Sequence, residues 1–433
     1  MRPNPSVRPG GLDGYIQTYI AVAKALKAVI PQAGFGPSNM AGINAGQGCA
    51  ACSSLDEFAD RVKSAGAPLD FVAASTYSRW DSNGFAPPAN MEGPVSYLRT
   101  VAERAGNPDA PVEVHEWGWA GWGDWNPDFG HVFWPEGAWS GAWALGSYLY
   151  QRKGGASRVF HWKYGFDSTL NRGVRGHGGN ASGTCSPGTA WKHGRPGTAG
   201  YCRARGYPLI TAWGWLLSAL LQAAPEREAA PPLMGRVQDN LELSEIVTDI
   251  PATAFQTSSG AAHTRRYNHT VGAIKAMDAQ GGILSYLIMH FSPDPIERLT
   301  RHFRLEVSRA DLQGLRLSST NSQAGDECAA LRVRQQALNK TTCVHDLIEE
   351  ELYRTHQLVK SENRSVDKIE KMATPEGLAM LVADAPHWMK LNRQSMVFKP
   401  FDGSVGVDGA GGGCALEFDL ETPSLLLLKI SKS

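Results

Sequence analysis

The sequence has no excess of charge of either sign. Its 42 lysines and arginines balance 42 aspartates and glutamates, and no block of like charges stands out. The sequence therefore indicates neither a basic surface for nucleic acid nor a charged tail. The sequence also lacks a run of about 18 apolar residues, the length that spans a bilayer as a helix. We predict no nucleic-acid partner and no membrane span.

Cysteine is sparse, and its spacing does not favour a metal site. Cys49 and Cys52 form a single Cys-x-x-Cys, and no second such motif exists to complete a zinc site. The other cysteines are two close pairs and a single residue: Cys185 with Cys202, Cys328 with Cys343, and Cys414. Short loops closed by disulfides are typical of an oxidising compartment. We predict local disulfides, no metal and no cofactor.

The N-terminus has no apolar core of the kind found in a signal peptide, because the chain opens Met1-Arg2-Pro3-Asn4-Pro5. Four Asn-x-Ser/Thr sequons are nevertheless compatible with secretion: Asn180, Asn268, Asn339 and Asn363. Both observations fit a chain that begins inside a longer secreted protein. The expected location is extracellular or within the secretory pathway. The signal peptide would then belong to the missing N-terminal part.

Helical and strand patterns alternate through the first half of the chain. Helices are predicted at 13–30, 55–65, 95–105, 137–152 and 207–221, and strands at 33–38, 69–77, 112–116 and 158–164. Such alternation indicates βαβ units and a parallel sheet. Only four strands are predicted, whereas a (β/α)₈ barrel needs eight. The fold class is therefore α/β, with a partial barrel corresponding to about strands 5–8.

The second half has a different character. We predict a half-barrel over residues 1–224, a Pro-rich linker over 225–240, and a β-sandwich-like domain over 241–433 with a helical insertion at about 329–382. Strands are expected at 270–277, 282–291, 302–307, 395–398, 415–420 and 424–430. No catalytic group is predicted in this second domain.

Chemistry-bearing side chains stand where the predicted strands of the first half end. The stretch Pro111–Trp119 is a strand that carries Glu116 near its end, among tryptophans. The other strand ends carry Ser38 and Asn39, Tyr77, and Trp162. The C-terminal ends of parallel strands meet at one rim, where barrel enzymes carry their sites. The competing interpretation is that Glu116 is a surface residue and that Tyr77 and Trp162 are ordinary core residues.

At these residues the chain resembles the retaining glycoside hydrolases of the large (β/α)₈ clan, and most of all glycoside hydrolase family 39, which includes β-xylosidase and α-L-iduronidase types. Four stretches are similar to the helix after the family's fourth strand and to the ends of its fifth, sixth and eighth strands: Tyr15–Pro31, Gly36–Ser38, Asp70–Tyr77 and Phe160–Trp162. Val114–Gly118 is similar to the end of the seventh strand, which carries the nucleophile. Tyr286–Phe291 and Thr422–Leu426 are similar to the family's C-terminal β-domain.

The resemblance implies a role for each of these side chains. Glu116 would be the nucleophile, and Tyr77 would hydrogen-bond it. Trp162 would stack on the sugar ring, while His115 and Trp117 would shape the wall of the subsite. For His115 a structural role is the competing interpretation.

Two departures from the family pattern affect the expected activity. Ser75 stands where the family usually has a histidine, two residues before Tyr77. The Asn-Glu-Pro motif that supplies the family's acid/base occurs nowhere in the sequence, and the family would place it just before residue 1. Three other glutamates are candidate substitutes: Glu92, Glu136 in an aromatic loop, and Glu113, expected deeper on the same strand face as Glu116. Of these, Glu136 is the best placed.

The sequence therefore predicts a retaining O-glycosyl hydrolase with a carbohydrate substrate, incomplete because the acid/base motif is missing. A non-catalytic carbohydrate-binding or scaffold protein derived from a glycosidase is the alternative. An unrelated structural α/β protein is a third.

Overall fold

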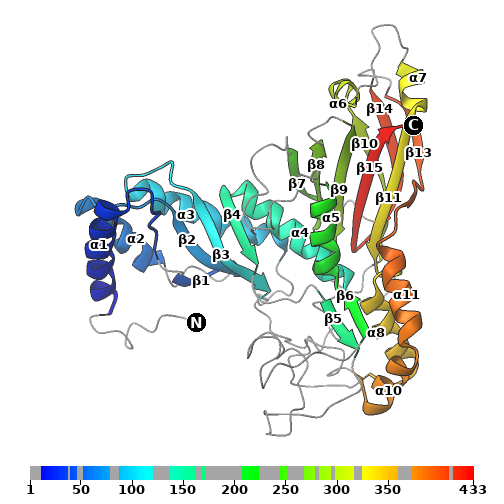
Figure 1. The fold of residues 1–433 in the computed structure, drawn as a ribbon, viewed down its shortest axis with the longest axis horizontal. Helices are drawn as coiled ribbons and strands as arrows, with labels where there is room; N and C mark the ends of the chain where they lie inside the picture. Colours follow the sequence, from blue (N-terminus) through cyan, green and yellow to red (C-terminus); the bar gives the residue numbers. More distant parts are fainter. Residues whose placement is uncertain are drawn as a thin grey trace.

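The computed structural model describes residues 11–37, 40–45, 52–78, 87–119, 137–161, 167–170, 207–223, 244–250, 268–277, 282–293, 298–315, 324–358, 373–408 and 413–433. These residues form a parallel sheet with its helices, and an antiparallel sandwich with a helical arm (Figure 1). The structure is α/β, as the sequence predicts. No helix within these ranges is both long and apolar enough to cross a membrane.

The first unit is a four-stranded parallel sheet in the order β1-β2-β3-β4. Its strands are β1 (Met40–Ala45), β2 (Val72–Ser78), β3 (Val112–Trp119) and β4 (Ala156–His161). Its helices are α1 (Gly11–Val29), α2 (Cys52–Ser64), α3 (Glu92–Arg104), which follows the short 3₁₀ helix η2 (Pro88–Met91), and α4 (Ala138–Lys153). β-branched residues such as Val72, Val112 and Val114 are fully buried in the layer between strands and helices, where their stiff side chains suit a pleated surface.

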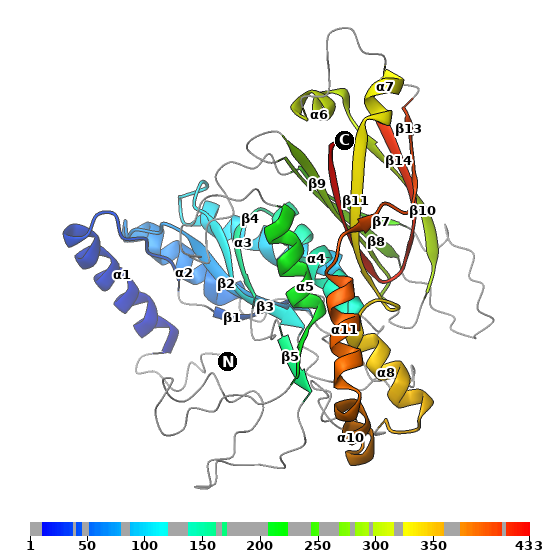
Figure 2. The same cartoon turned by 45° about the vertical axis from the view of Figure 1, so that its right-hand side comes forward.

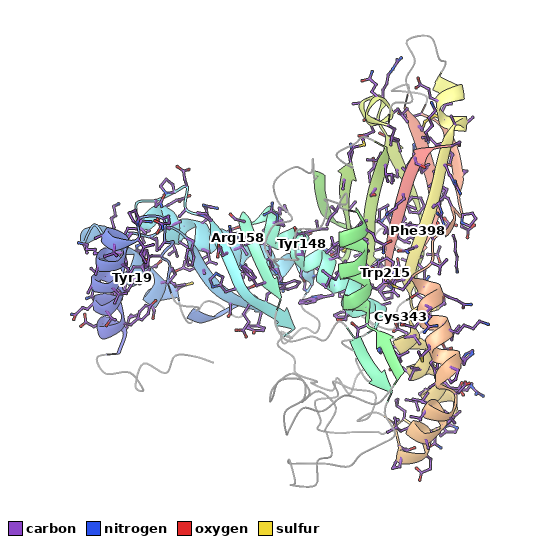
Figure 3. The ribbon with its side chains drawn as sticks, viewed as in Figure 1. Tyr19, Tyr148, Arg158, Trp215, Cys343 and Phe398 are labelled. Atoms are coloured by element: carbon purple, nitrogen blue, oxygen red, sulfur yellow. A yellow bond between two sulfur atoms is a disulfide. The ribbon has the colours of Figure 1, made fainter. Side chains whose placement is uncertain are left out.

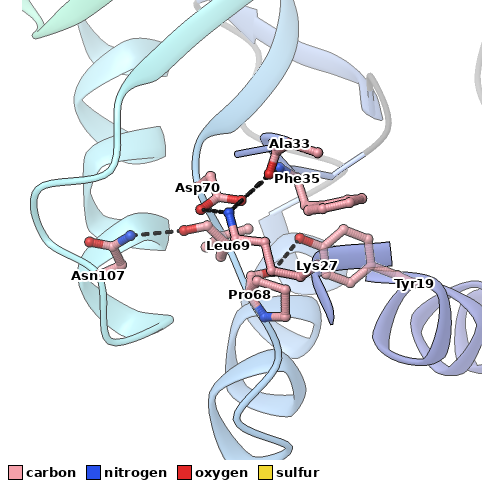
Figure 4. Close-up of polar contacts among 8 residues, drawn as sticks. All are labelled: Tyr19, Lys27, Ala33, Phe35, Pro68, Leu69, Asp70 and Asn107. Carbon is pink, nitrogen blue, oxygen red and sulfur yellow. Dashed lines mark hydrogen bonds and ion pairs between the residues drawn. The ribbon is translucent and has the colours of Figure 1, made fainter. Parts of the chain in front are cut away.

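Polar contacts fix α1 to the loops that precede β2 (Figure 4). Lys27 bonds both the carbonyl oxygen of Ala33 and the carboxylate of Asp70, each at 2.9 Å. Asp70 also accepts a hydrogen bond from the backbone N–H of Phe35 at 2.8 Å. The hydroxyl of Tyr19 donates to the carbonyl of Pro68 at 2.7 Å. Because Lys27 and Tyr19 of α1 bond three separate groups, the rotation of the helix about its own axis is fixed.

The second unit is a sandwich of two antiparallel sheets (Figure 2). The larger sheet has the order β12-β11-β15-β9-β8-β7 and the smaller β10-β14-β13. The larger consists of β7 (Ser244–Ile250), β8 (His269–Met277), β9 (Ile283–Phe291), β11 (Leu331–Asn339), β12 (Lys399–Pro400) and β15 (Ser424–Lys432). The smaller consists of β10 (Thr300–Val307), β13 (Ser404–Val407) and β14 (Cys414–Glu421).

Six further helices and one further strand pair lie within the described residues. The helices are α5 (Ala212–Ala223), α6 (Arg309–Gly314), α7 (Ala324–Ala329), α8 (Val344–Arg354), α10 (Pro375–Ala383) and α11 (Ala385–Ser395), of which α6 and α7 are short. The strands β5 (Asp167–Leu170) and β6 (Tyr207–Ile210) form an antiparallel pair.

The helix α4 joins the two units, and nearly all of its residues are buried. Its glycines allow other elements to approach closely. A Cβ on Gly146 would lie 3.0 Å from Pro88 and 3.1 Å from Met289 of β9, and one on Gly141 would lie 3.1 Å from Leu425 of β15. The half-barrel and the sandwich therefore share one continuous hydrophobic core through α4.

Several sequence predictions are wrong in detail. No strand occupies the described part of 33–38, and β1 begins only at Met40. The helix predicted at 207–221 begins only at Ala212, since residues 207–210 pair as β6. The insertion at 329–382 contains the strand β11, and 395–398 is not a strand. The proposed linker 225–240 lies outside the described residues.

The cysteine pairing also differs from the sequence prediction. Cys328 is bonded to Cys414, 86 residues away, and Cys343 is a buried free thiol. Sequence proximity suggested Cys328 with Cys343. The structure instead places Cys414 at the start of β14, in the core of the sandwich with Cys328.

Candidate functional site

A β-bulge in β3 determines which face Glu116 occupies. Ala74 of β2 pairs with Val114, but the next residue, Ser75, pairs with Glu116, so His115 is an extra residue in β3. In a regular strand, residues 113 and 116 would point to opposite faces because side chains alternate. The bulge shifts this alternation by one residue. Glu116 therefore shares a face with Glu113, and the sequence expectation for these two residues is met only because of the bulge.

Two hydroxyl groups from β2 hold the carboxylate of Glu116. The Tyr77 hydroxyl donates a hydrogen bond to Oε1, and the Ser75 hydroxyl donates to Oε2 at 3.4 Å. Ser75 is fully buried, and Glu116 is only partly so. Each carboxylate oxygen thus has its own donor, and the two donors fix the plane of the group.

Glu113 is bonded by two side chains, Arg158 and His115. Its Oε1 lies 3.2 Å from Nη1 of Arg158, the residue opposite it on β4, and its Oε2 lies 2.8 Å from Nε2 of His115. Figure 3 labels Arg158 on β4, an edge strand of the parallel sheet. Glu113 is 7% exposed. A buried carboxylate with both oxygens bonded is poorly placed to give a proton to a substrate.

The His115 ring lies between two phenylalanines on the same face. Its centroid is 5.6 Å from that of Phe71 and 5.7 Å from that of Phe160. Phe71 directly precedes β2, His115 belongs to β3, and Phe160 belongs to β4. His115 is thereby held both by Glu113 and by aromatic packing, and it remains partly exposed. Its predicted contact with a substrate stays a prediction.

Trp117 lies on the other side of the sheet. It is 4% exposed, and its ring centroid is 6.0 Å from that of Trp143 on α4. This position favours a packing role over the predicted contact with a sugar. The position also agrees with the bulge. Val112, Val114 and Trp117 all belong to the helix-facing core, and without the extra residue Trp117 would point to the other face.

The remaining predicted site residues cannot be placed. Ser38, Asn39, Trp162 and the alternative acid Glu136 lie outside the described residues. Glu92 is described and forms an ion pair with Lys153 at 3.0 Å. Lys153 ends α4, just before β4 begins, so Glu92 lies near the opposite end of the strands from Glu116.

Sequence reasoning missed two members of this cluster. The sequence singles out Ser75 only as a departure from a family pattern, and it does not single out Arg158. Arg158 lies beside Val159 and Phe160 in β4 and its side chain is 54% exposed, so the sequence gives no signal for its partner. The bulge itself has no recognisable signature in the sequence.

Comparison with known proteins identifies structures of similar fold but no protein of similar sequence. No family model and no curated protein matches the sequence. Among solved structures, the GH39 enzyme from Xanthomonas axonopodis pv. citri matches with a TM-score of 0.50 at 14% identity, covering 97% of this chain. The fold is a partial match to that of the GH39 enzymes. The chain spans 64% of the length of that structure.

Two further solved structures are similar at lower scores. A monomeric β-xylosidase from Caulobacter crescentus CB15 matches with a TM-score of 0.47 at 13% identity, over 96% of this chain and 65% of its own. A bacterial orthologue of human α-L-iduronidase matches with a TM-score of 0.49 at 13% identity, over 100% of this chain and 61% of its own.

Proposed function

We propose that this protein is the nucleophile-bearing part of a retaining O-glycosyl hydrolase. One observation carries the proposal. Glu116, in the C-terminal half of a parallel strand, is oriented by the Tyr77 and Ser75 hydroxyls on the side of the sheet away from the helices. The fold shared in part with a GH39 enzyme supports it.

The chemistry proposed for Glu116 is attack on the anomeric carbon. The C–O bond to the leaving group breaks as a glycosyl ester forms, and water then hydrolyses the ester. A second carboxyl group, about 5–5.5 Å away, must protonate the leaving oxygen and later activate the water. Glu113 is bonded by Arg158 and His115, and Glu92 lies near the far end of the strands. We therefore assign the acid/base to polypeptide outside the described residues.

The substrate proposed is a carbohydrate with an exposed glycosidic bond. Glycosides of xylose and iduronic acid are the first to test, since solved structures of similar fold are named for them. The Cys328–Cys414 disulfide supports the further proposal that the protein works in an oxidising, extracellular or secretory compartment.

Covalent trapping tests the nucleophile directly. A 2-deoxy-2-fluoro glycoside should leave its sugar esterified on the peptide that contains Glu116, detectable by mass spectrometry. Glu116→Gly should abolish hydrolysis of 4-nitrophenyl glycosides, and added azide should restore release of nitrophenol with formation of a glycosyl azide. Glu92→Gln is the control and should hydrolyse normally. Labelling of a different carboxylate would refute the assignment.

The alternative is a carbohydrate-binding or scaffold protein without catalysis. The absence of an Asn-Glu-Pro motif from the sequence is the observation that favours it. In that case calorimetry would detect saccharide binding, which Glu116→Gln would weaken, while no glycoside would be cleaved or trapped even when the polypeptide encoded upstream is supplied.

A further inference from the structure

The bulge in β3 interrupts the pairing of this strand on both of its sides. On the β2 side, His115 is the extra residue between Val114 and Glu116. On the β4 side, regular pairing stops at Val114 and resumes at Trp117, so that His115 and Glu116 together oppose the single residue Phe160. A bulge disrupts the ladder of backbone hydrogen bonds locally. The two ladders that hold the rest of β3 therefore do not by themselves fix the segment that carries Glu116.

The extra residue is held through its side chain instead. Nε2 of His115 lies 2.8 Å from Oε2 of Glu113, two residues earlier on the strand and on the same face. The imidazole also lies between Phe71 and Phe160, at centroid distances of 5.6 and 5.7 Å. Because His115 and Glu116 are consecutive residues, a fixed imidazole restricts the backbone from which the Glu116 carboxylate projects.

Glu113 is anchored in turn from β4. Its Oε1 lies 3.2 Å from Nη1 of Arg158, the residue that pairs with it across the strands. The Glu113 side chain is 9% exposed and the Arg158 side chain 54% exposed. A buried ion pair adds little net stability compared with an apolar pair, and its best attested use is to select one arrangement over another. One bond from Arg158 to Glu113 and one from Glu113 to His115 thus connect β4 to the bulge.

We propose that Glu113 and His115 are positioning residues for Glu116. Glu113 holds the imidazole of His115, and the imidazole holds the bulge. In that arrangement the Glu116 carboxylate meets the Tyr77 and Ser75 hydroxyls. Neither positioning residue needs to contact the substrate. The proposal deepens the proposed function and rests on it for the reaction that Glu116 performs.

A positioning role and a purely structural role predict different effects of truncation. If the bond between Glu113 and His115 served folding alone, its loss would lower the free energy of unfolding and leave the folded chain equally reactive. If the bond positions Glu116, its loss slows the folded chain itself, since a misplacement of about 1 Å can cost on the order of 10²-fold in rate. Arg158 is more than half exposed, so water can solvate it in Glu113→Ala, and this variant should fold.

The test measures how fast Glu116 is labelled in the full chain by a 2,4-dinitrophenyl 2-deoxy-2-fluoro-xyloside. This leaving group departs without protonation, so the rate reports the attack of Glu116 and needs no acid. His115→Ala and Glu113→Ala should each lower the labelling rate at saturating reagent about 10- to 100-fold. The half-saturating concentration should change less than about twofold, because the loss falls on the chemical step and not on binding. Glu113→Gln keeps a carbonyl acceptor for the imidazole and should recover most of the rate.

Two controls isolate the bond between the positioning residues. The double variant Glu113→Ala with His115→Ala should be no slower than the slower single variant, because both residues act through one bond. Glu92→Ala removes another ion-paired carboxylate of the same unit, bonded by Lys153 near the opposite end of the strands, and should be labelled like the unchanged chain. Urea unfolding of each variant gives the folded fraction to which its rate is normalised.

Each outcome decides between the proposals. Equal rates per folded molecule in the unchanged chain and both alanine variants overturn the positioning role. A double variant slowed by the product of the single effects also overturns it, as does a Glu113→Gln variant that recovers no rate. An unchanged chain that is not labelled at Glu116 refutes the proposed function instead, and crystal structures of the alanine variants then decide the positioning role. A Glu116 carboxylate displaced from the Tyr77 and Ser75 hydroxyls supports that role, and an unmoved carboxylate overturns it.

Discussion

The two large sheets of this molecule reverse the usual relation between strand direction and burial. Parallel sheets are generally covered on both faces, whereas antiparallel sheets often leave one face in water. Here the antiparallel six-stranded sheet is covered on both sides. Leu287 and Leu427 face α4 and α5, while Leu284 and Leu428 face the smaller sheet. The parallel sheet has helices on one side, and on the other Phe160 stays partly exposed.

This difference separates stability from function. The sandwich has a finished core, and the only chemistry we assign to the molecule lies on the unfinished sheet. A change in the finished sheet should therefore affect folding, and a change on the open face should affect activity.

The largest expected effect is catalytic. Glu116→Gln should lower kcat for glycoside hydrolysis on the order of 10³-fold or more, as loss of a nucleophile does in other hydrolases. Because Glu116 is partly exposed, the free energy of unfolding should change by less than about 1 kcal/mol. Steady-state kinetics and urea unfolding check the two halves of this prediction. A large loss of stability would mean that the residue is structural.

Truncation of a side chain in the covered six-stranded sheet should lower the stability of the fold. Leu427→Ala removes a fully buried side chain of β15 and should cost about 2–5 kcal/mol in urea unfolding. Val405→Ala, on the exposed strand β13, is the matched control and should cost less than about 0.5 kcal/mol. Equal costs for the two variants would show that the larger sheet is not packed as described.

The pH dependence of stability should report on α8. Burial raises the pKa of Glu349 to about 8, from 4.5, and the nearby Asp346 carboxylate adds to the rise. The folded chain thus keeps a proton that the unfolded chain releases, and stability falls as pH rises towards 8. Burial lowers the pKa of His345 from 6.5 to about 3, which makes stability rise with pH between those values.

The two residues oppose each other below pH 6.5, and only Glu349 acts between 6.5 and 8. Urea unfolding at pH 6.5 and pH 8 should therefore show a loss for the unchanged chain. Glu349→Gln should remove most of that loss, and His345→Gln should leave it intact. A loss that persists in Glu349→Gln would contradict the assignment.

A smaller effect is expected where the two units meet. Asp346 of α8 accepts a hydrogen bond at 2.7 Å from the backbone N–H of Ala138, the first residue of α4. Asp346→Ala should cost about 1 kcal/mol, as the loss of a helix N-cap does, and Asp346→Asn should cost less because it keeps an acceptor. Amide exchange at Ala138 reports on the same bond and should accelerate only in the alanine variant.

The smallest effect should come from the open face. Phe160→Ala in the chain alone should cost less than about 1 kcal/mol, because the side chain is 40% exposed. A loss of several kcal/mol in the chain alone would show that the face is already covered.

The sequence predicts the elements whose signal is local. The helices near 55–65 and 137–152 and the strand at 112–116 follow from periodicity and flanking glycine or proline, and each has a counterpart in the structure. β11 was missed because its alternating charged residues, Arg332 and Arg334, read as a helical insertion. Its position depends on pairing with β15, almost a hundred residues later, and such pairing leaves no local mark.

The same limit applies to the site. Glu116 and Tyr77 were identified because aromatic residues and a carboxylate near strand ends are unusual. The orientation of Glu116 depends on a one-residue bulge at His115, and the state of Glu113 depends on Arg158 across the sheet. Both are properties of register between strands, which a single sequence does not specify. The Cys328–Cys414 bond is a third case, since only the fold of the sandwich brings these two residues together.

The glycines of α4 have a practical meaning for anyone who rebuilds this protein. Because Gly141 and Gly146 let Leu425 and Met289 rest against the helix backbone, α4 is shaped by two partners at once. A chimaera cut between the half-barrel and the sandwich would give α4 a foreign surface on one side, so donor segments must be exchanged together with the strands that touch it. The domain boundary predicted from sequence composition, at residues 225–240, is therefore a poor junction for a chimaera.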